Sequence, residues 1–178
     1  MSTIATTPDV LIPAGTWKAD AGHSVVEFRV KHMGFTTIRG EFLDFDATVV
    51  GGAEPEIAGA IRVGSVETHD EARDNHIKSP DFFDPERHPE ATVVATHIGE
   101  GTLTADVTLR GVTKPVEFTY AVYGPSADPW GNERIGLDLS GQINRQDFGV
   151  AWNAPLPGGG FLVDDAVKLD ASFSLIKA

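Results

Sequence analysis

The sequence has no cysteine among its 178 residues, and its 14 lysines and arginines are outnumbered by 26 aspartates and glutamates. The absence of cysteine excludes disulfides, thiolate chemistry and zinc sites with cysteine ligands. The formal net charge of -12 opposes contact with phosphate backbones and with anionic lipid surfaces. We therefore expect no nucleic acid as a partner.

Long hydrophobic runs are also missing. No run of about 18 apolar residues occurs, so we expect no transmembrane segment. The residues before Lys18 contain no lysine or arginine and no apolar run of signal-peptide length, which predicts a cytoplasmic location. The length and the 41% hydrophobic content predict one domain, residues 15–178, after a poorly ordered N-terminal extension, residues 1–14. A homodimer is compatible with this sequence.

Alternation of apolar and polar residues dominates the chain. Between His23 and Met33, for example, Val26, Phe28 and Val30 alternate with charged residues, which predicts a half-buried strand. A shift of one residue in this alternation within 37–50 predicts a β-bulge. The predicted strands are 23–33, 37–50, 57–66, 92–98, 102–110, 116–123, 133–144 and 165–175, with turns at 51–52, 99–101, 111–115 and 128–131.

One segment has a helical pattern. Thr68 and Glu71 form a capping box, with Thr68 as the N-cap, and Pro80 ends the segment. The fold class predicted from these elements is all-β: a single antiparallel lipocalin-like β-barrel of about eight strands, with one short helical insertion near residues 69–79. A barrel of this size is filled by side chains or holds one small ligand.

Four segments resemble the YceI family of polyisoprenoid-binding proteins. They are GTWKADAGHSVVEFRVKHMG, SVETHDEARDNHIKSPDFFD, GTLTADVTLRGVTKPVEF and DPWGNERIGLDLSGQINRQDFGV, in the order found in the family. The resemblance implies an extended lipocalin-like barrel around a long apolar tunnel that binds isoprenoid or fatty chains, with no established catalytic residues. Many family members are exported, whereas this N-terminus has no recognisable export signal. Val93 and Ala105 stand where such proteins often have Phe and Gly.

The candidate ligand-binding residues share the apolar side of the long strands or belong to the segment 144–164. Small residues on the same inward sides of the strands (Gly40, Ala47, Gly59, Ala105 and Gly141) leave room in the barrel, unless neighbouring large side chains fill it. The candidates are Val26, Phe28, Val30, Phe42, Phe45, Val107, Leu109, Phe118, Tyr120, Leu137, Leu139, Phe148, Trp152, Leu169 and Phe173.

The segment 144–164 is long for a loop in a compact domain, and such loops usually have a function or are mobile. It contains Phe148, Trp152 and Phe161, together with two prolines and the triplet Gly158 to Gly160. Two interpretations stay open: an apolar lid over the tunnel mouth, or a packed loop whose aromatic side chains plug the barrel end.

Spacing argues against a metal site at the helix. His69 and His76 are seven residues apart, so helix rise separates them by roughly 10 Å, and we expect no metal and no cofactor. The sequence has no nucleophile-elbow or phosphate-loop pattern and no catalytic residue is assigned. The cations that could contact a diphosphate head group are Arg39, Arg73, Lys114 and Arg145. The alternative for each of them is a role in a surface ion pair.

The predicted function is non-enzymatic binding, storage or transport of a long apolar lipid in the barrel. A polyisoprenoid, an isoprenoid quinone or a similar fatty chain is the expected partner. The alternative is a metal-dependent or histidine-based enzyme that acts at the barrel mouth around His32, His69 and His76. Extraction of bound lipid followed by mass spectrometry separates the two.

Overall fold

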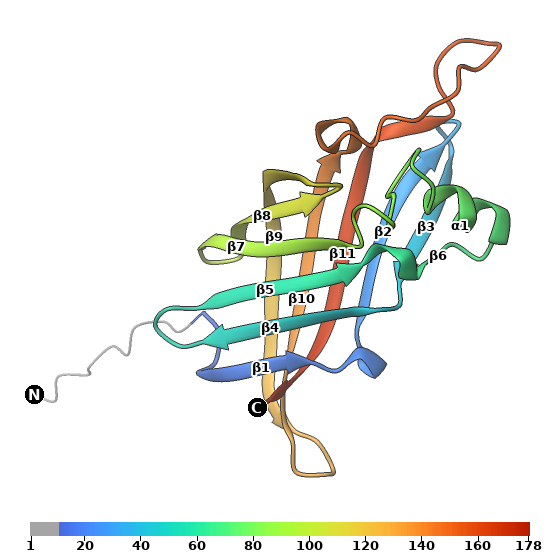
Figure 1. The fold of residues 1–178 in the computed structure, drawn as a ribbon. Helices are drawn as coiled ribbons and strands as arrows, with labels where there is room; N and C mark the ends of the chain where they lie inside the picture. The colour runs from blue at the N-terminus through green and yellow to red at the C-terminus, as the bar shows by residue number, and fades with distance from the viewer. Residues whose placement is uncertain (1–10) are drawn as a thin grey trace, which may run out of the picture.

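The structure, a computed structural model, describes residues 11–178 (Figure 1). Its strands are all antiparallel and form one continuous sheet. The elements in chain order are β1 (Gly15–Ala19), η1 (Ala21–His23), β2 (Val25–His32), β3 (Thr36–Phe42), β4 (Phe45–Gly51), β5 (Glu56–Arg62), η2 (Val63–Ser65), β6 (Val66–Glu67), α1 (Glu71–Ile77), β7 (Glu90–Ile98), β8 (Thr102–Leu109), β9 (Val112–Ala127), β10 (Glu133–Asn144), η3 (Arg145–Phe148) and β11 (Val163–Lys177).

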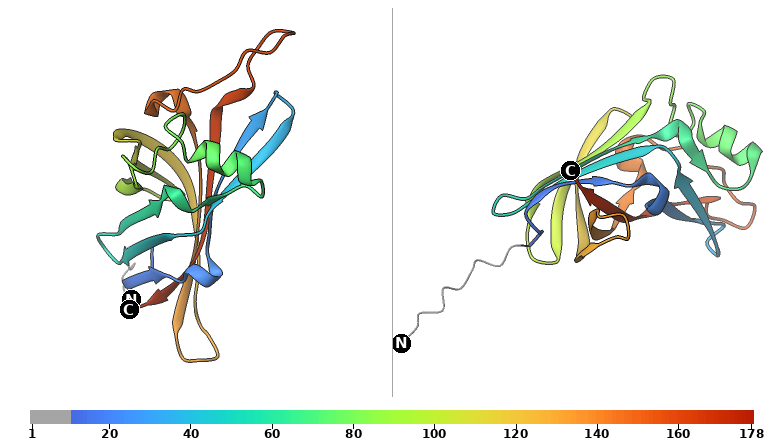
Figure 2. Two further views of the ribbon diagram at one scale, coloured as in Figure 1. Left: turned by 45° about the vertical axis from the view of Figure 1, so that its right-hand side comes forward. Right: turned by 90° about the horizontal axis from the view of Figure 1, so that it is seen from below.

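Eight of these strands close into a barrel, which confirms the predicted fold class. The ring runs β1-β4-β5-β7-β8-β9-β10-β11, and it closes because β1 pairs with both β4 and β11. The long strand β11 changes partner along its length: residues 175–177 pair with β1, and residues 163–172 pair with β2. Strands β2, β3 and β6 therefore branch from the ring and widen the barrel at one end, with α1 beside them (Figures 1 and 2).

Strand β8 shows why the sequence folds this way. Its apolar residues Leu103, Ala105, Val107 and Leu109 are all buried, and they alternate with threonine and aspartate on the outer face. The next turn consists of Arg110 and Gly111, both with positive φ, a conformation that suits the twist of a two-residue hairpin. The turn predicted at 111–115 is therefore wrong. Residues 112–115 already belong to β9 and pair with β8.

Two predicted strands are each divided in the structure. The segment predicted as one bulged strand, 37–50, forms β3 and β4, with Leu43 and Asp44 between them. β3 pairs with β2, whereas β4 pairs with β1 and β5. The shift in alternation therefore marks a corner where the chain passes from the branch into the ring, and not a bulge. The segment 57–66 likewise forms β5, the short η2 and the first residue of β6, which returns to pair with β3.

The helix lies where it was predicted, but its cap differs. Asp70 is the N-cap, and its side chain accepts a hydrogen bond from the backbone N–H of Arg73. Thr68 is buried outside the helix, and its hydroxyl donates to the carboxylate of Asp74. The sequence pattern did not distinguish these two N-cap candidates, because Thr and Asp are both favourable N-cap residues.

The described chain is packed onto the barrel from its first residues. Ile12 is fully buried, its carbonyl accepts from the Gly52 N–H, and the Pro13 carbonyl accepts from Nε1 of Trp17 at 2.9 Å. Residues 11–14 thus belong to the folded unit, although the sequence placed them in an extension. The predicted disorder of residues 1–10 lies outside the described residues. Between residues 11 and 178, no helix has the length and apolar character needed to cross a membrane.

Candidate functional site

A cavity of about 480 Å³ occupies the widened end of the barrel, a size typical of small-molecule sites. Its walls are mainly aliphatic and aromatic. The exposed Lys31 and the half-buried His76 are part of the lining, so the cavity reaches the surface at this end. The full lining is Phe28, Val30, Lys31, His32, Ile38, Phe42, Ile61, Val63, Ala72, Arg73, His76, Ile77, Phe82, Phe83, Ala91, Val93, Val107, Leu109, Ile143, Arg145, Val150, Trp152, Leu162, Val163, Val167 and Leu169.

The long strands β8, β10 and β11 contribute to this cavity only with their parts near the widened end, and β9 contributes no lining residue. In β8, Val107 and Leu109 line the cavity, whereas Leu103 and Ala105 do not. In β11, the last lining residue toward the C-terminus is Leu169. The cavity thus occupies the half of the barrel near the widened end. Its inner limit lies at Val107 in β8 and at Leu169 in β11.

Phenylalanine rings fill the barrel below that limit. Gly141 pairs with Leu169 on one side and Phe118 on the other, and the Phe118 ring covers it so closely that an added Cβ would lie 2.7 Å from the ring. Phe45 and Phe173, which also lie outside the cavity, meet with ring centroids 5.9 Å apart. At Gly141, a neighbouring large side chain therefore takes the space that a small residue leaves.

The same packing occurs at Gly40 in the cavity wall. A Cβ at Gly40 would overlap the ring of Phe28. Phe28, Phe42 and Phe83 form a cluster in which ring centroids are 5.7 to 6.1 Å apart. The ring of Phe28 fills the gap at Gly40 and presents its remaining surface to the cavity.

Seven of the fifteen candidate ligand-binding residues line the cavity: Phe28, Val30, Phe42, Val107, Leu109, Trp152 and Leu169. The other eight lie in the core outside it: Val26, Phe45, Phe118, Tyr120, Leu137, Leu139, Phe148 and Phe173. Alternation identifies the inward face of a strand, but it does not tell how far along the barrel axis an inward residue lies.

Sequence reasoning missed the part of the lining that comes from helix α1 and the turn after it. Ile77 ends the helix, and Phe82 and Phe83 follow in the Asp-Phe-Phe-Asp-Pro turn. Two adjacent phenylalanines in a tight turn next to a short helix were the available signal, because such a turn buries its apolar side chains against the barrel.

The segment 144–164 contributes both to the core and to the cavity wall. Phe148 is buried in the core, whereas Trp152 lines the cavity. The rings of His76, Phe82 and Trp152 form a cluster: His76 lies edge-on to the other two at centroid distances of 5.0 and 4.6 Å, and Phe82 and Trp152 are 5.5 Å apart. This cluster joins the segment to α1 at the cavity mouth, while Phe161 is 63% exposed.

Arg145 fixes the base of this segment. Its side chain is buried, and its guanidinium donates to the carbonyls of Val150, Trp152 and Asp164 at 2.7 to 2.9 Å. Burial lowers the pKa of Arg145 below its ordinary value, and the nearby carboxylates of Asp164 and Asp165 oppose that shift. The donors of Arg145 are thus occupied by the protein's own backbone.

The four candidate head-group cations are not brought together. Arg73 and Arg145 line the cavity, whereas Arg39 and Lys114 do not, and both of these are exposed. Arg73 donates from Nε to the hydroxyl of Thr68 and from Nη2 to its carbonyl. Of the four cations, Arg73 remains the one best placed to face a bound molecule.

Two of the three histidines of the alternative hypothesis line the cavity, His32 and His76, whereas the exposed His69 does not. Nε2 of His76 lies 2.9 Å from Asp81. The lining contains no serine, threonine, aspartate or glutamate, so its histidines have no hydroxyl or carboxylate partner inside the cavity. Across residues 11–178, no group of three or more histidines and carboxylates is arranged to hold a metal ion.

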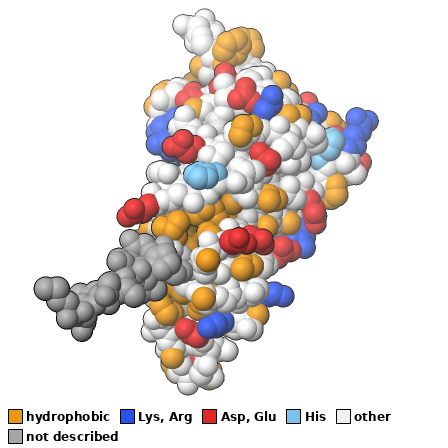
Figure 3. Space-filling view, turned by 90° about the vertical axis from the view of Figure 1, so that its left-hand side faces the viewer, with side chains coloured by type: hydrophobic (Ala, Val, Ile, Leu, Met, Phe, Trp, Pro, Cys, Tyr) orange, Lys and Arg blue, Asp and Glu red, His pale blue; other side chains and the backbone are white. Residues whose placement is uncertain are grey.

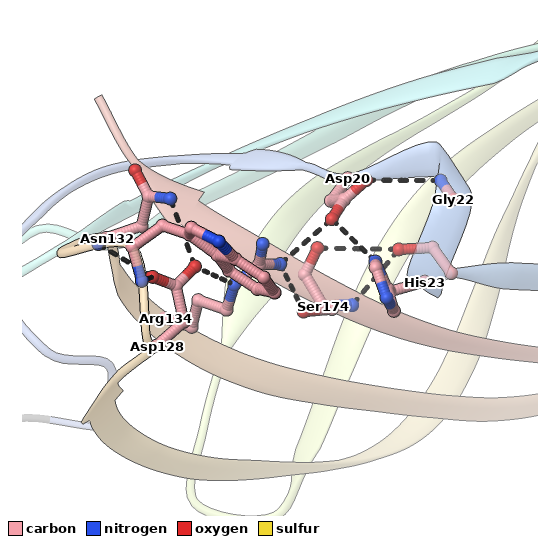
Figure 4. A network of polar contacts seen from close by, with 9 residues as sticks. Asp20, Gly22, His23, Asp128, Asn132, Arg134 and Ser174 are labelled. Carbon is pink, nitrogen blue, oxygen red and sulfur yellow. Dashed lines mark hydrogen bonds and ion pairs between the residues drawn. The ribbon is translucent and has the colours of Figure 1, made fainter.

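A polar network holds the opposite end of the barrel together (Figure 4). Arg134 donates to Asp128 and Asp20, both at 2.9 Å, and to the hydroxyl of Ser174 at 3.1 Å. These bonds lower the pKa of Asp128 and of Asp20 and raise that of Arg134. The network joins η1, β11 and the β9–β10 turn at the end away from the cavity.

Comparison with known proteins gives a consistent result along most of the chain. A family model described as a YceI-like domain matches residues 17–175. A UPF0312 protein of Staphylococcus aureus is 34% identical over 158 residues, 86% of this chain and 92% of its own length. A UPF0312 protein of Pectobacterium atrosepticum is 33% identical, over 84% of this chain and 82% of its own.

Solved structures share the fold. A YCEI protein of Campylobacter jejuni matches with a TM-score of 0.70 and 26% identity, over 83% of this chain and 90% of its own. BcnA of Burkholderia cenocepacia also has a TM-score of 0.70, with 23% identity over 90% of this chain and 99% of its own. A polyisoprenoid binding domain from Saccharophagus degradans, implicated in plant cell wall breakdown, has a TM-score of 0.71 and 15% identity over 93% of this chain and 100% of its own.

Proposed function

The chain belongs to the YceI-like family, and from its cavity we propose that it binds one long apolar molecule, an isoprenoid chain, and catalyses no reaction on it. The observation that carries the proposal is the apolar lining at the open end of a closed barrel. Burial of apolar carbons contributes roughly 0.8 kcal/mol per methylene group, so this lining supplies affinity without polar contacts. The polyisoprenoid binding domain from Saccharophagus degradans gives a precedent for this ligand on the same fold.

The polar lining residues suggest how the ligand is oriented. Lys31, His32, Arg73, His76 and Arg145 are the ionisable residues of the lining, and all of them are basic. A ligand with a hydroxyl, carbonyl or phosphate end would place that end at the mouth, near Arg73 and His76, and its hydrocarbon chain inside. An isoprenoid alcohol or a quinone with a polyisoprenoid tail meets this description.

A tryptophan at Val167 tests the proposal directly. Val167 lies in a row with Val30 and Ile143, and all three line the cavity. In Val167→Trp, the new indole occupies space that the ligand needs, so we expect at least a tenfold loss of farnesol affinity. Fluorescence displacement measures that affinity. Mass spectrometry of an organic extract tests in addition whether the purified wild-type protein carries an isoprenoid.

The neighbouring Ala166 provides the matched control. Ala166 is exposed and does not line the cavity, so Ala166→Trp adds the same side chain to the outer surface. We expect its farnesol affinity to equal that of the wild type. Equal affinity of Val167→Trp and Ala166→Trp would exclude this cavity as the binding site.

The remaining predictions about function need separate measurements. Storage or transport, the cytoplasmic location and the homodimer stay predictions. Cell fractionation tests the location, and light scattering of the purified protein tests the dimer.

A further inference from the structure

Two uncharged hairpin tips stand beside the cavity mouth. One is the β2–β3 turn, in which Phe35 is 72% exposed and Met33 is partly exposed. The other is the hairpin at 155–161, in which the exposed Phe161 forms a bridge with Pro155 beside the tip. The N–H of Met33 donates to the carbonyl of Leu162 at 2.8 Å, so the two hairpins are joined side by side. We call residues 33–38 and 155–161 the mouth hairpins.

The mouth hairpins continue the cavity outward. His32 and Leu162 line the cavity, and their chain neighbours Met33 and Phe161 lie on the surface. Both hairpins project at the same end of the molecule (Figures 1 and 2). Any apolar molecule that enters at this end passes between or beside these tips.

The charge distribution distinguishes this end from the rest of the protein. Residues 148–163 contain no charged side chain, and neither do residues 33–38, in a chain with a net charge of -12. Figure 3 shows uncharged and hydrophobic side chains at the projecting end, and acidic and basic side chains over the body below it. Aromatic side chains held out on an uncharged tip are suited to the interface of a bilayer.

We propose that the mouth hairpins dock the protein on a lipid bilayer of neutral headgroups, with Phe35 and Phe161 inserted at the interface and the cavity mouth facing the membrane. This inference rests on the proposed function, because a long isoprenoid dissolves in membranes and not in water. A neutral surface fits better than an anionic one, since the net charge of -12 is repelled by anionic lipids. Docking would let the ligand pass between bilayer and cavity without crossing water.

Vesicle co-sedimentation tests the proposal with the wild-type protein and phosphatidylcholine vesicles. The variant Phe35→Ser/Phe161→Ser removes both rings from exposed positions, where substitutions rarely unfold a protein. Loss of one fully inserted phenyl ring weakens binding by roughly ten- to a hundredfold, so we expect the double variant to bind at least tenfold more weakly. Replacing part of the phosphatidylcholine by phosphatidylglycerol should weaken wild-type binding.

Trp130 provides the control at the other end of the barrel. It is 81% exposed in the β9–β10 turn, and its backbone N–H donates to Asp128 of the polar network at 2.9 Å. Trp130→Ser removes an equally exposed aromatic ring, and we expect its vesicle binding to match the wild type. A similar loss in Trp130→Ser and in the double variant would overturn the proposed orientation.

Farnesol affinity measured without vesicles separates this inference from the proposed function. We expect the double variant to keep wild-type farnesol affinity, because Phe35 and Phe161 do not line the cavity. Normal farnesol binding by a wild-type protein that does not sediment with phosphatidylcholine vesicles would refute docking alone. A dimer that the double substitution dissociates, with vesicle binding unchanged, would instead identify the hairpins as a contact between two copies and would also refute docking.

Discussion

Phe118 lies next to the inner end of the cavity, and we expect Phe118→Ala to deepen the cavity. The ring lies over Gly141 in the same row as Leu169, the last cavity residue of β11. Removing it opens space for about one more isoprene unit. At about 0.8 kcal/mol per carbon this unit contributes about 4 kcal/mol, of which about 1 kcal/mol is lost to ordering. The net gain corresponds to roughly a hundredfold in affinity.

The assay compares geraniol, farnesol and geranylgeraniol, which differ by one isoprene unit each. In the wild type, affinity should stop rising once the chain reaches Phe118. In Phe118→Ala, the limit should move to the next longer prenol, while the affinity for the shorter ones changes little. Chemical denaturation must accompany the assay, because a buried Phe→Ala substitution costs about 3–5 kcal/mol of stability.

Leu137→Ala controls for the loss of stability. Leu137 is fully buried four residues along β10 from Gly141, about 13 Å away, and does not line the cavity. This substitution costs about 2–5 kcal/mol and leaves a void that the ligand does not reach. The reasoning is refuted if Phe118→Ala is folded and keeps the wild-type length limit, or if Leu137→Ala shifts the limit equally.

Three further predictions concern stability and binding. The pKa of Asp128 lies below its ordinary value of 3.8 in the folded protein, mainly because Arg134 bonds to it. The ionised form of Asp128 therefore stabilises the fold above about pH 4, and this contribution is lost as the pH falls further. Asp128→Asn should therefore lower the melting temperature most at neutral pH, and this decrease should shrink as the pH falls below about 4; a decrease that does not change with pH would contradict the ionic account. Arg145→Met leaves three backbone carbonyls without the guanidinium that donates to them. It should therefore lower the free energy of unfolding in urea by at least about 2 kcal/mol and speed up proteolysis within 150–164. Unchanged proteolysis would show that Arg145 does not anchor the segment. Gly40→Val pushes the Phe28 ring toward the cavity. This substitution should cost about 1–3 kcal/mol of stability and weaken farnesol binding. Unchanged farnesol binding would argue against that displacement of the ring.

The sequence determined the class of fold because alternation is a local property. Leu103, Ala105, Val107 and Leu109 alternate with polar residues, and this pattern has only one stable arrangement, a strand with one buried face. The family resemblance was readable for a similar reason, since its motifs are short and contiguous. The corner at Leu43 and Asp44 was misread as a bulge because both shift the alternation by one residue, and only the pairing partners of β3 and β4 distinguish them.

The extent of the cavity was decided by tertiary structure alone. Phe28 and Phe118 both face inward next to a glycine, yet one lines the cavity and the other closes the barrel below it. They differ in their positions along the barrel axis. These positions depend on the register between strands that are distant in the sequence, such as β10 and β11. Register is set by packing over the whole sheet, so no local pattern of residues could report where the space inside this barrel ends.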